Sequence, residues 1–484
     1  MLDTGHTAWM LASSALVLLM TPGLAFFYGG LTRAKSTLNM MMMSFVSIGI
    51  VSLMWVLVGF SMSFGTTRTW GGGGLVGDFG KAFLKGVGPG DYGNGSKAAL
   101  NIGNYATGVP DNVLVAFQLM FAIITVALIS GAIADRAKFG GWVAFSILWV
   151  TLCYFPVAHW VFDFGTAAPK DAAGNVTGPV GAGVANTFVA KSGGWITNRL
   201  GVLDFAGGTA VHINAGAAAL ALCLLLGKRK GWPGSAMKPH NVPFVLLGSG
   251  LLWFGWFGFN AGSALQANGL AGQAFINTQL ATAVAGLAWI GVERLRDGHA
   301  TNVGFASGAV SGLVAITPAC GSVNSMGAVG VGAIAGGLCA LAVALKYTFG
   351  FDDSLDVVGV HLVGGLAGTL SVGLFATKDV NGAVDGLFFG GGLSQLGKQA
   401  IGAGAVLAYS FVLAYVIGFL VDKTIGFRIT EEDEVTGIDL TNHGESAYEF
   451  SAYGGGSSLL GSLSGSGSDR PAAVSTATTP KVEV

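Results

Sequence analysis

The chain has 484 residues, of which 52% are hydrophobic and 10% are charged, and its formal net charge is −1. A soluble domain carries about a quarter charged residues, so most of this surface must face something other than water. The near-zero net charge excludes a strongly electrostatic nucleic-acid-binding protein, and 80 glycines in long apolar stretches are typical of closely packed membrane helices.

Eleven apolar stretches are candidate membrane spans, each of which needs about 20 mainly apolar residues. They start near residues 8, 43, 113, 141, 204, 243, 273, 303, 326, 358 and 399. The first stretch has no basic segment before it, and Thr21-Pro22-Gly23 interrupts it without ending it. This pattern favours a retained first span over a cleaved signal peptide.

The basic residues indicate the orientation of these spans. Connections that follow odd-numbered spans contain Arg33, Lys35, Arg136, Lys138, Lys228, Arg229, Lys230, Lys238, Arg294, Arg296 and Lys346. The short connections 261–272 and 319–325, on the opposite side, contain neither Lys nor Arg. The positive-inside rule therefore places the N-terminus outside and the C-terminus in the cytoplasm, as an odd number of spans requires.

A histidine follows an aspartate by eight residues at two places: Asp204 and His212, and Asp353 and His361. A glycine stands four residues after each histidine. The two elements fall in the fifth and tenth predicted spans, so two halves of five spans must have opposite orientations. We therefore expect a five-plus-five inverted repeat, a transporter architecture whose substrate path lies between the halves.

Ionisable groups are costly inside a membrane, roughly 2.5–3.5 kcal/mol for an acid at the centre of a span. If each element were one continuous α-helix, its aspartate would lie at the helix start, where it can cap N–H groups, and its histidine would lie deeper. A single buried histidine is usually a core residue, but a matched pair in a repeat favours a pore. A metal site needs three or four ligands, and the other histidines lie at the wrong depth, so we expect no metal.

These elements predict three regions. Residues 1–421 form an all-α membrane domain, with repeat halves at about 5–227 and 243–376 and an eleventh helix at 399–421. Residues 422–453 form an acidic, polar cytoplasmic tail. Residues 454–484 are rich in Gly, Ser, Pro and Thr, which predicts a disordered extension.

Four motifs closely resemble those of the ammonium transporters of the Amt/Mep/Rh family. They are "MTPGLAFFYGG" (20–30), "DFAGGTAVHINAG" (204–216), "GWFGFNAGSA" (255–264) and "DVVGVHLVGGLAGTL" (356–370). The resemblance runs from about residue 5 to about residue 450. It implies a multi-pass homotrimer in the cell membrane with one pore per subunit, which carries ammonium or ammonia, needs no cofactor and is not an enzyme.

The resemblance also implies roles for individual residues. His212 and His361 correspond to twin histidines that lie side by side in a narrow hydrophobic pore and relay a proton. Phe121 and Phe259 correspond to the two halves of a stacked gate, and the hydroxyl of Ser263 corresponds to an acceptor for ammonium in the outer vestibule.

Further positions match the family around this path. Asp204 resembles an acid at the base of the vestibule, which supports its structure and the recruitment of the cation. Phe117 and Gln118 resemble vestibule residues, although two phenylalanines at i, i+4 are also ordinary core packing. Asn260 and Asp353 are assigned structural roles.

One departure from the family concerns the aromatic wall of the recruitment site. The family usually has a tryptophan shortly after "VAH", whereas "VAHWVFDFG" has Phe162 at the matching offset and Trp160 two residues earlier. An insertion follows and ends at "GGWI" (193–196), which makes Trp195 a third candidate. The motif leaves open which of the three closes the site.

The tail resembles the family's regulatory C-terminal region, which in bacterial members faces a PII-type signal protein; a merely solvated acidic tail is the alternative. The main rival function is an ammonium sensor that signals through this tail. With no appended kinase or cyclase domain, transport is favoured. An intramembrane enzyme that uses Asp and His would need a nucleophile or a metal beside them, and Ser263 follows an aromatic motif instead of a strand–turn elbow. Conduction of carbon dioxide is a further alternative.

Overall fold

The computed structural model describes residues 3–65, 74–87, 108–164, 193–234 and 237–448. The extension predicted over 454–484 lies outside these residues. The regular structure of the described part is helical, and its β-pairing is limited to two isolated antiparallel bridges, between Ala137 and Arg428 and between Val323 and Ala376. The predicted all-α class is therefore confirmed.

Ten helical segments of the described chain are long and apolar enough to cross a membrane. Their main helices are α1 (Thr4–Leu31), α2 (Thr37–Met54), α4 (Asp111–Ile129), α5 (Phe139–Trp149), α7 (Asn214–Leu226), α8 (Val242–Gly262), α9 (Gly269–Asp297), α11 (Ser325–Ala342), α13 (Val363–Phe375) and α15 (Ser394–Thr424). Three of the segments continue into the short helices α3 (Phe60–Phe64), α6 (Phe155–Phe162) and α12 (Leu345–Phe349).

These ten segments correspond to ten of the eleven predicted spans. The remaining one, predicted near residue 303, is the apolar helix α10 (Asn302–Ile316), which has 15 residues. A helix of that length is about 22 Å long, shorter than the ~30 Å hydrocarbon core. The span predicted near residue 303, the eighth in chain order, therefore stays a prediction.

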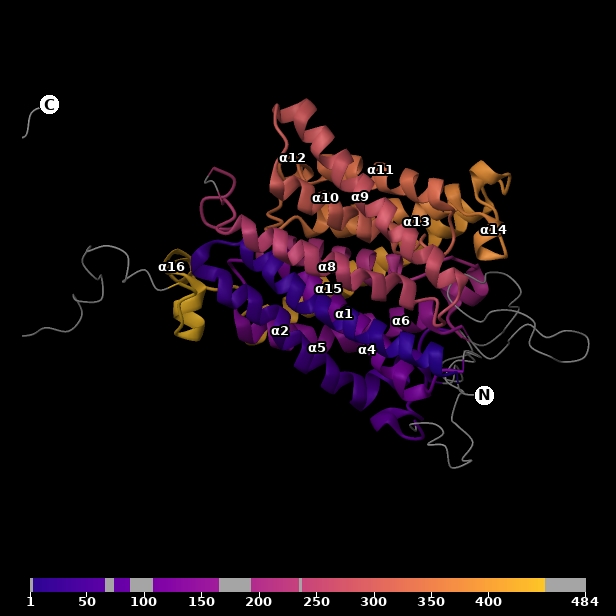
Figure 1. Cartoon of the computed structure of the whole chain (residues 1–484). Coiled ribbons are helices and arrows are strands. Elements are labelled where there is room, and N and C mark those ends of the chain that lie inside the picture. The colour runs from indigo at the N-terminus through magenta and orange to yellow at the C-terminus, as the bar shows by residue number, and fades with distance from the viewer. Residues whose placement is uncertain (1–2, 66–73, 88–107, 165–192, 235–236, 449–484) are drawn as a thin grey trace, which may run out of the picture.

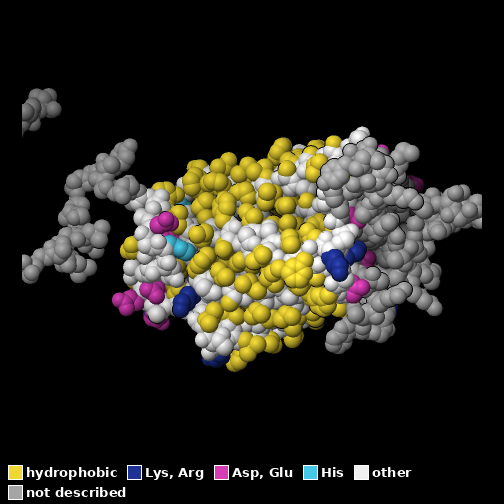
Figure 2. Space-filling view, turned by 90° about the horizontal axis from the view of Figure 1, so that it is seen from below, with side chains coloured by type: hydrophobic (Ala, Val, Ile, Leu, Met, Phe, Trp, Pro, Cys, Tyr) yellow, Lys and Arg dark blue, Asp and Glu magenta, His cyan; other side chains and the backbone are white. Residues whose placement is uncertain are grey.

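The long helices form one bundle in which most run along a common direction (Figure 1). The N-terminus and the short helix α14 (Lys378–Asn381) lie at one end of the bundle, and α16 (Glu431–Thr436) lies at the other. Figure 2 shows apolar side chains over the middle of one face and charged side chains toward its two ends. Leu53, Phe254 and Ile401 are each more than half exposed. This is the surface of a multi-pass membrane protein, whose apolar belt faces lipid.

Glycines allow neighbouring helices to touch, as their abundance predicted. A Cβ atom added to Gly30 of α1 would lie 2.7 Å from the carbonyl oxygen of Asn241, at the start of α8. A Cβ atom added to Gly312 of α10 would lie 2.7 Å from the carbonyl oxygen of Ala281 in α9. Any side chain at these positions would push the helices apart.

The described part of the tail packs against the end of the bundle that carries α16. The carboxylate of Asp439 accepts hydrogen bonds from the backbone N–H groups of Leu38 (2.9 Å) and Asn39 (2.8 Å) at the start of α2. At the far end of the tail, the Nε2 atom of His240 lies 2.7 Å from the hydroxyl of Tyr448. The described part of the tail thus folds onto the loops.

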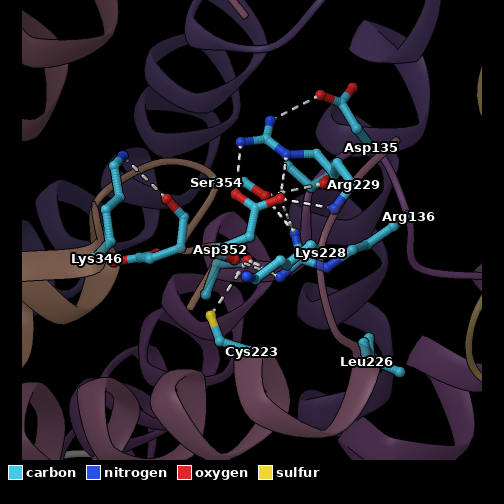
Figure 3. A network of polar contacts seen from close by, with 12 residues as sticks. Asp135, Arg136, Cys223, Leu226, Lys228, Arg229, Lys346, Asp352 and Ser354 are labelled. Atoms are coloured by element: carbon cyan, nitrogen blue, oxygen red, sulfur yellow. Dashed lines mark hydrogen bonds and ion pairs between the residues drawn. The ribbon is translucent and has the colours of Figure 1, made fainter. Parts of the chain in front are cut away.

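A buried ion network joins three loops at this same end (Figure 3). The guanidinium of Arg229 donates to both carboxylate oxygens of Asp352 (2.9 and 2.8 Å) and to the Oδ2 atom of Asp135 (3.1 Å). Arg136 donates to the hydroxyl of Ser354 (2.6 Å) and to the carbonyl oxygen of Asp352 (2.5 Å). Burial lowers the pKa of Arg229, but its bonds and charge contacts with the two aspartates outweigh this effect and raise that pKa above its usual value.

Candidate functional site

Two histidines from separate halves of the chain meet inside the bundle. His212 lies in the π-helical turn Gly208–Ile213 that leads into α7, and His361 lies in the π-helical turn Val358–Leu362 that leads into α13. Their Nδ1 atoms are 3.2 Å apart, and the planes of their rings differ by 18°. Both side chains are buried, with exposures of 1% and 2%.

The contact between the two Nδ1 atoms fixes a relation between the protonation patterns of the rings. One Nδ1 must carry the hydrogen and the other must accept it. Two neutral rings are therefore opposite tautomers, so that one has a bare Nε2 and the other has a protonated Nε2. The Nε2 atom of His212 is buried and has no hydrogen-bond partner in the described part of the chain.

Each histidine segment is held by the aspartate that precedes it. The carboxylate of Asp204 accepts from the N–H groups of Gly207 (2.8 Å), Gly208 (2.6 Å) and Thr209 (2.7 Å), and also from the Thr209 hydroxyl. Asp353 plays the same part for His361. It accepts from the N–H groups that open that helix, at 3.1 and 2.7 Å. Both carboxylates thus satisfy backbone donors at helix starts, which offsets the cost of burying them.

The expectation of a continuous α-helix from aspartate to histidine is wrong. Gly207 and Asp356, each three residues after its aspartate, have positive φ angles of 112° and 64°. A left-handed residue cannot continue a right-handed helix, so helical structure starts only after it. The histidines are then presented from π-helical turns instead of regular α-helix.

A column of aromatic rings leads to the histidines. The rings of Phe121 and Phe259 are stacked, with centroids 4.1 Å apart and planes 25° apart. Phe117 contacts Phe121 on one side (4.8 Å), and Phe259 lies 6.2 Å from the ring of His212 on the other. The predicted gate pair therefore does stack, and it adjoins the histidines.

Helix α8 orders the column, because two of its residues and the residue that caps its C-terminal end lie on one face at i, i+3 and i+7. They are Trp256, Phe259 and Ser263. Trp256 stacks on His212, with centroids 5.3 Å and planes 17° apart. Ser263 stands about 10 Å further along the helix axis, on the other side of Phe259. Its hydroxyl donates to the carbonyl oxygen of Phe259 (2.8 Å), which leaves the lone pairs of the hydroxyl oxygen for another donor.

Of the three candidates for the aromatic wall, Phe162 contacts the gate. Its ring meets that of Phe121 edge-on at 6.1 Å. Trp160 packs instead against Trp195 (5.7 Å) and Tyr409 (4.7 Å), and its indole N–H donates to the carbonyl oxygen of Leu75 (2.7 Å). The insertion between Phe162 and Trp195 falls largely on residues 165–192, which lie outside the described part.

The remaining predicted residues surround the column. The side-chain amide of Asn260 donates to the hydroxyl of Thr278 (2.9 Å) and so ties α8 to α9. Gln118 is buried on α4, next to Phe117. Sequence reasoning missed Trp256, whose indole N–H donates to the hydroxyl of Thr317 (2.9 Å). Its position one turn before Phe259 was the available signal.

Replacing Asp204 with asparagine is expected to destabilise the protein by about 1–3 kcal/mol, because the new amide group would face backbone N–H donors and leave at least one of them unsatisfied. Thermal unfolding of the purified protein in detergent measures the effect. Asp353→Asn is the matched control, with a smaller expected loss because Asp353 accepts fewer bonds. Equal unfolding temperatures for Asp204→Asn and the unmodified protein would contradict the role of Asp204 in holding the turn.

Comparisons with known proteins agree with this geometry. A model of the Ammonium Transporter Family matches residues 8–448. An ammonium transporter of Mycobacterium tuberculosis is 55% identical over 468 residues, which cover 94% of this chain and 92% of that protein. The crystal structure of Candida albicans Mep2 is similar with a TM-score of 0.75 and 32% identity, over 89% of this chain and 88% of that one. A structure described as a sensor Amt protein gives a TM-score of 0.75 and 28% identity, over 91% and 98% of the two chains. This multi-pass membrane protein therefore belongs to the ammonium transporter family, as its motifs predicted.

Proposed function

We propose that this protein carries ammonium or ammonia across the cell membrane, through a path that runs from Ser263 past the Phe121–Phe259 stack to His212 and His361. The single observation that supports this path best is the direct contact between an aromatic stack and a hydrogen-bonded pair of buried histidines. Relatives over nearly the whole chain are named ammonium transporters, and no enzymatic activity is proposed.

The first step of the proposal is recruitment of ammonium beside Ser263. The hydroxyl oxygen of Ser263 accepts one hydrogen bond from the cation, and Phe117, Phe121 and Phe162 offer aromatic surfaces. Each cation–π contact contributes about 0.5–2 kcal/mol. Potassium resembles ammonium in size but donates no hydrogen bond, so this combination favours ammonium. Asp204 contributes negative charge below the site and holds the following turn.

The second step is passage of the gate with loss of a proton. Rings 4.1 Å apart leave no room between them, so Phe121 and Phe259 must move aside for each molecule. In an apolar pore beyond the gate, a bare cation is costly, whereas neutral ammonia passes easily. The geometry therefore favours separation of ammonium into ammonia and a proton at this level.

The third step is a proton relay between the histidines. The proton binds the bare Nε2 of one ring, and the hydrogen on the Nδ1 of that ring moves to the Nδ1 of the other. The second ring then releases the hydrogen from its own Nε2. Each transfer leaves both rings neutral with their tautomers exchanged, so no isolated charge stays in the apolar pore.

The proposal includes the organisation of the chain. We assign a membrane domain to residues 1–421, with α10 as the eighth of eleven spans, the N-terminus outside and the C-terminus in the cytoplasm. The inverted repeat of 5–227 and 243–376 is supported by the shared order of capping aspartate, left-handed residue, π-helical turn and histidine in both halves. The regulatory tail covers 422–453, and assembly as a homotrimer with a PII-type protein at the cytoplasmic face is proposed from the family resemblance.

The test is solid-supported-membrane electrophysiology on proteoliposomes, with pulses of ammonium, methylammonium and potassium. We expect a current with ammonium, a smaller one with methylammonium and none with potassium, because potassium can neither donate a hydrogen bond nor lose a proton. Absence of both current and flux with ammonium would contradict transport. Binding without flux would favour the sensor, the alternative on the same fold.

A further inference from the structure

The glycines four residues after the histidines pack across the interface between the two halves. A Cβ atom added to Gly216 would lie 2.5 Å from the backbone nitrogen of Leu362 and 2.7 Å from its Cα atom. A Cβ atom added to Gly365 would lie 3.0 Å from the Cγ1 atom of Ile213 and 3.1 Å from its backbone nitrogen. Neither glycine has a positive φ angle, so the close approach, and not backbone strain, is what requires glycine here.

The two contacts are reciprocal. Leu362 directly follows His361, and Ile213 directly follows His212, so each glycine packs against the residue next to the other histidine. The added Cβ of Gly365 would also lie 3.1 Å from the Cβ atom of His212 itself. The two helices can therefore approach this closely, one turn after the histidines, because neither Gly216 nor Gly365 carries a side chain.

We propose that Gly216 and Gly365 are positioning residues that set the distance at which His212 and His361 share a hydrogen bond. The expected effect on transport rests on the proposed proton relay, whereas the expected effect on the distance between the histidines does not. Non-bonded carbon atoms prefer separations of about 3.5–4.0 Å. A side chain at Gly216 must therefore move the segments apart by roughly 1 Å, which lengthens a 3.2 Å contact beyond the hydrogen-bond range.

The two positions differ in a way that sharpens the test. Gly216 faces the backbone of Leu362, which no change of rotamer can move away. A Cβ atom at Gly365 would meet its neighbours less closely, at 3.0–3.1 Å, and the nearest of them is the Cγ1 atom of the Ile213 side chain. Gly365→Ala should therefore be the milder change. Removal of Cγ1 by Ile213→Ala should partly restore the Nδ1–Nδ1 separation and the current of the Gly365→Ala protein.

The experiment compares Gly216→Ala, Gly365→Ala, Ile213→Ala and the double variant Gly365→Ala/Ile213→Ala. Gly404→Ala in α15 is the matched control, because a Cβ atom there would meet nothing within 4 Å. Cryo-electron microscopy measures the Nδ1–Nδ1 separation, and proteoliposome currents measure transport at a series of ammonium concentrations.

For Gly216→Ala we expect the Nδ1–Nδ1 separation to exceed 3.5 Å and the maximal current to fall about tenfold or more, since a 1 Å misplacement can cost about 10²-fold in a reaction that depends on geometry. The apparent affinity for ammonium should stay unchanged, because Ser263 and its aromatic neighbours are untouched. Gly365→Ala should lie between Gly216→Ala and the control, and the double variant should carry more current than Gly365→Ala.

Three outcomes would overturn the inference or separate it from the proposed function. An unchanged Nδ1–Nδ1 separation in Gly216→Ala would overturn it. If Gly216→Ala does not fold, an unchanged Nδ1–Nδ1 separation in Gly365→Ala would overturn it. If neither the unmodified protein nor Gly404→Ala carries ammonium current, the proposed transport fails, and the measured separations still decide whether the glycines position the histidines.

Discussion

Replacement of either His212 or His361 with alanine is expected to lower the ammonium current by about 10²-fold or more, the range that a positioned proton-transfer group contributes. Each ring supplies one half of the Nδ1–Nδ1 contact, and loss of either half leaves the other ring without this partner in the proposed pore. The relay needs both rings, so the two single variants should fail to a similar extent. Current and flux of radiolabelled methylammonium, measured on the same proteoliposomes, check the prediction.

His299→Ala is the matched control, because His299 is exposed in the connection between α9 and α10. Thermal unfolding of every variant separates loss of function from loss of folding, which matters because His212 also stacks on Trp256. If selective, electrogenic uptake survived both histidine changes undiminished, the relay would be wrong. Flux without current would instead indicate that the pore conducts ammonia while the proton takes another route.

The sequence predicted most helices because a membrane span is a local property. About 20 apolar residues in succession are visible without any tertiary contact, and ten such segments are found in the described chain. The stacking of Phe121 on Phe259 and the meeting of His212 and His361 came from motifs shared with a family, because no spacing along the chain brings residues together that lie more than a hundred positions apart.

The parts that could not be predicted depend on backbone conformation and on side-chain direction. Periodicity gives no sign that Asp356 adopts a left-handed conformation, yet this residue and Gly207 decide where the histidine-bearing helices start. Trp160 and Phe162 are two residues apart, which on a helix turns them by about 200°. One ring can therefore face the gate while the other faces away, and the sequence alone does not tell which.

The ion network of Figure 3 could not be predicted from the sequence either. Arg136 and Arg229 were used there as markers of the cytoplasmic side, which treats them as solvated charges. Both are buried, Arg136 at 0% exposure and Arg229 at 6%, and their partners come from other loops. Charge counting reports where a basic residue stands relative to the membrane but not whether a carboxylate from elsewhere neutralises it.

Arg229→Met is expected to destabilise the protein by about 3–5 kcal/mol, the cost of removing one partner from a buried ion pair. Methionine occupies part of the volume of arginine but leaves the buried carboxylates of Asp135 and Asp352 without the guanidinium that contacts both. Lys230→Met is the matched control at the next position. Its ion pair with Glu431 is exposed and screened, so little change in the unfolding temperature is expected.

The pH dependence of this loss distinguishes an unpaired charge from poor packing. Burial raises the pKa of Asp352, but Arg229 and Arg136 outweigh it and hold that pKa below its usual value of about 3.9. The stabilisation from the pair is therefore complete only above about pH 5, and it is lost as the pH falls from there through the depressed pKa. Without Arg229, burial favours a protonated Asp352. The difference in the free energy of unfolding between Arg229→Met and the unmodified protein should therefore become smaller at acidic pH.

The double variant Arg229→Met/Asp352→Asn removes the charge on both sides of the strongest contact in the network. Its loss of unfolding free energy should be smaller than the sum of the losses in the two single variants. Each single change leaves a buried charge without its partner, and the double change does not. A loss in Arg229→Met that stayed constant with pH and added fully to that of Asp352→Asn would mean that arginine stabilises these loops through its volume and not through its charge.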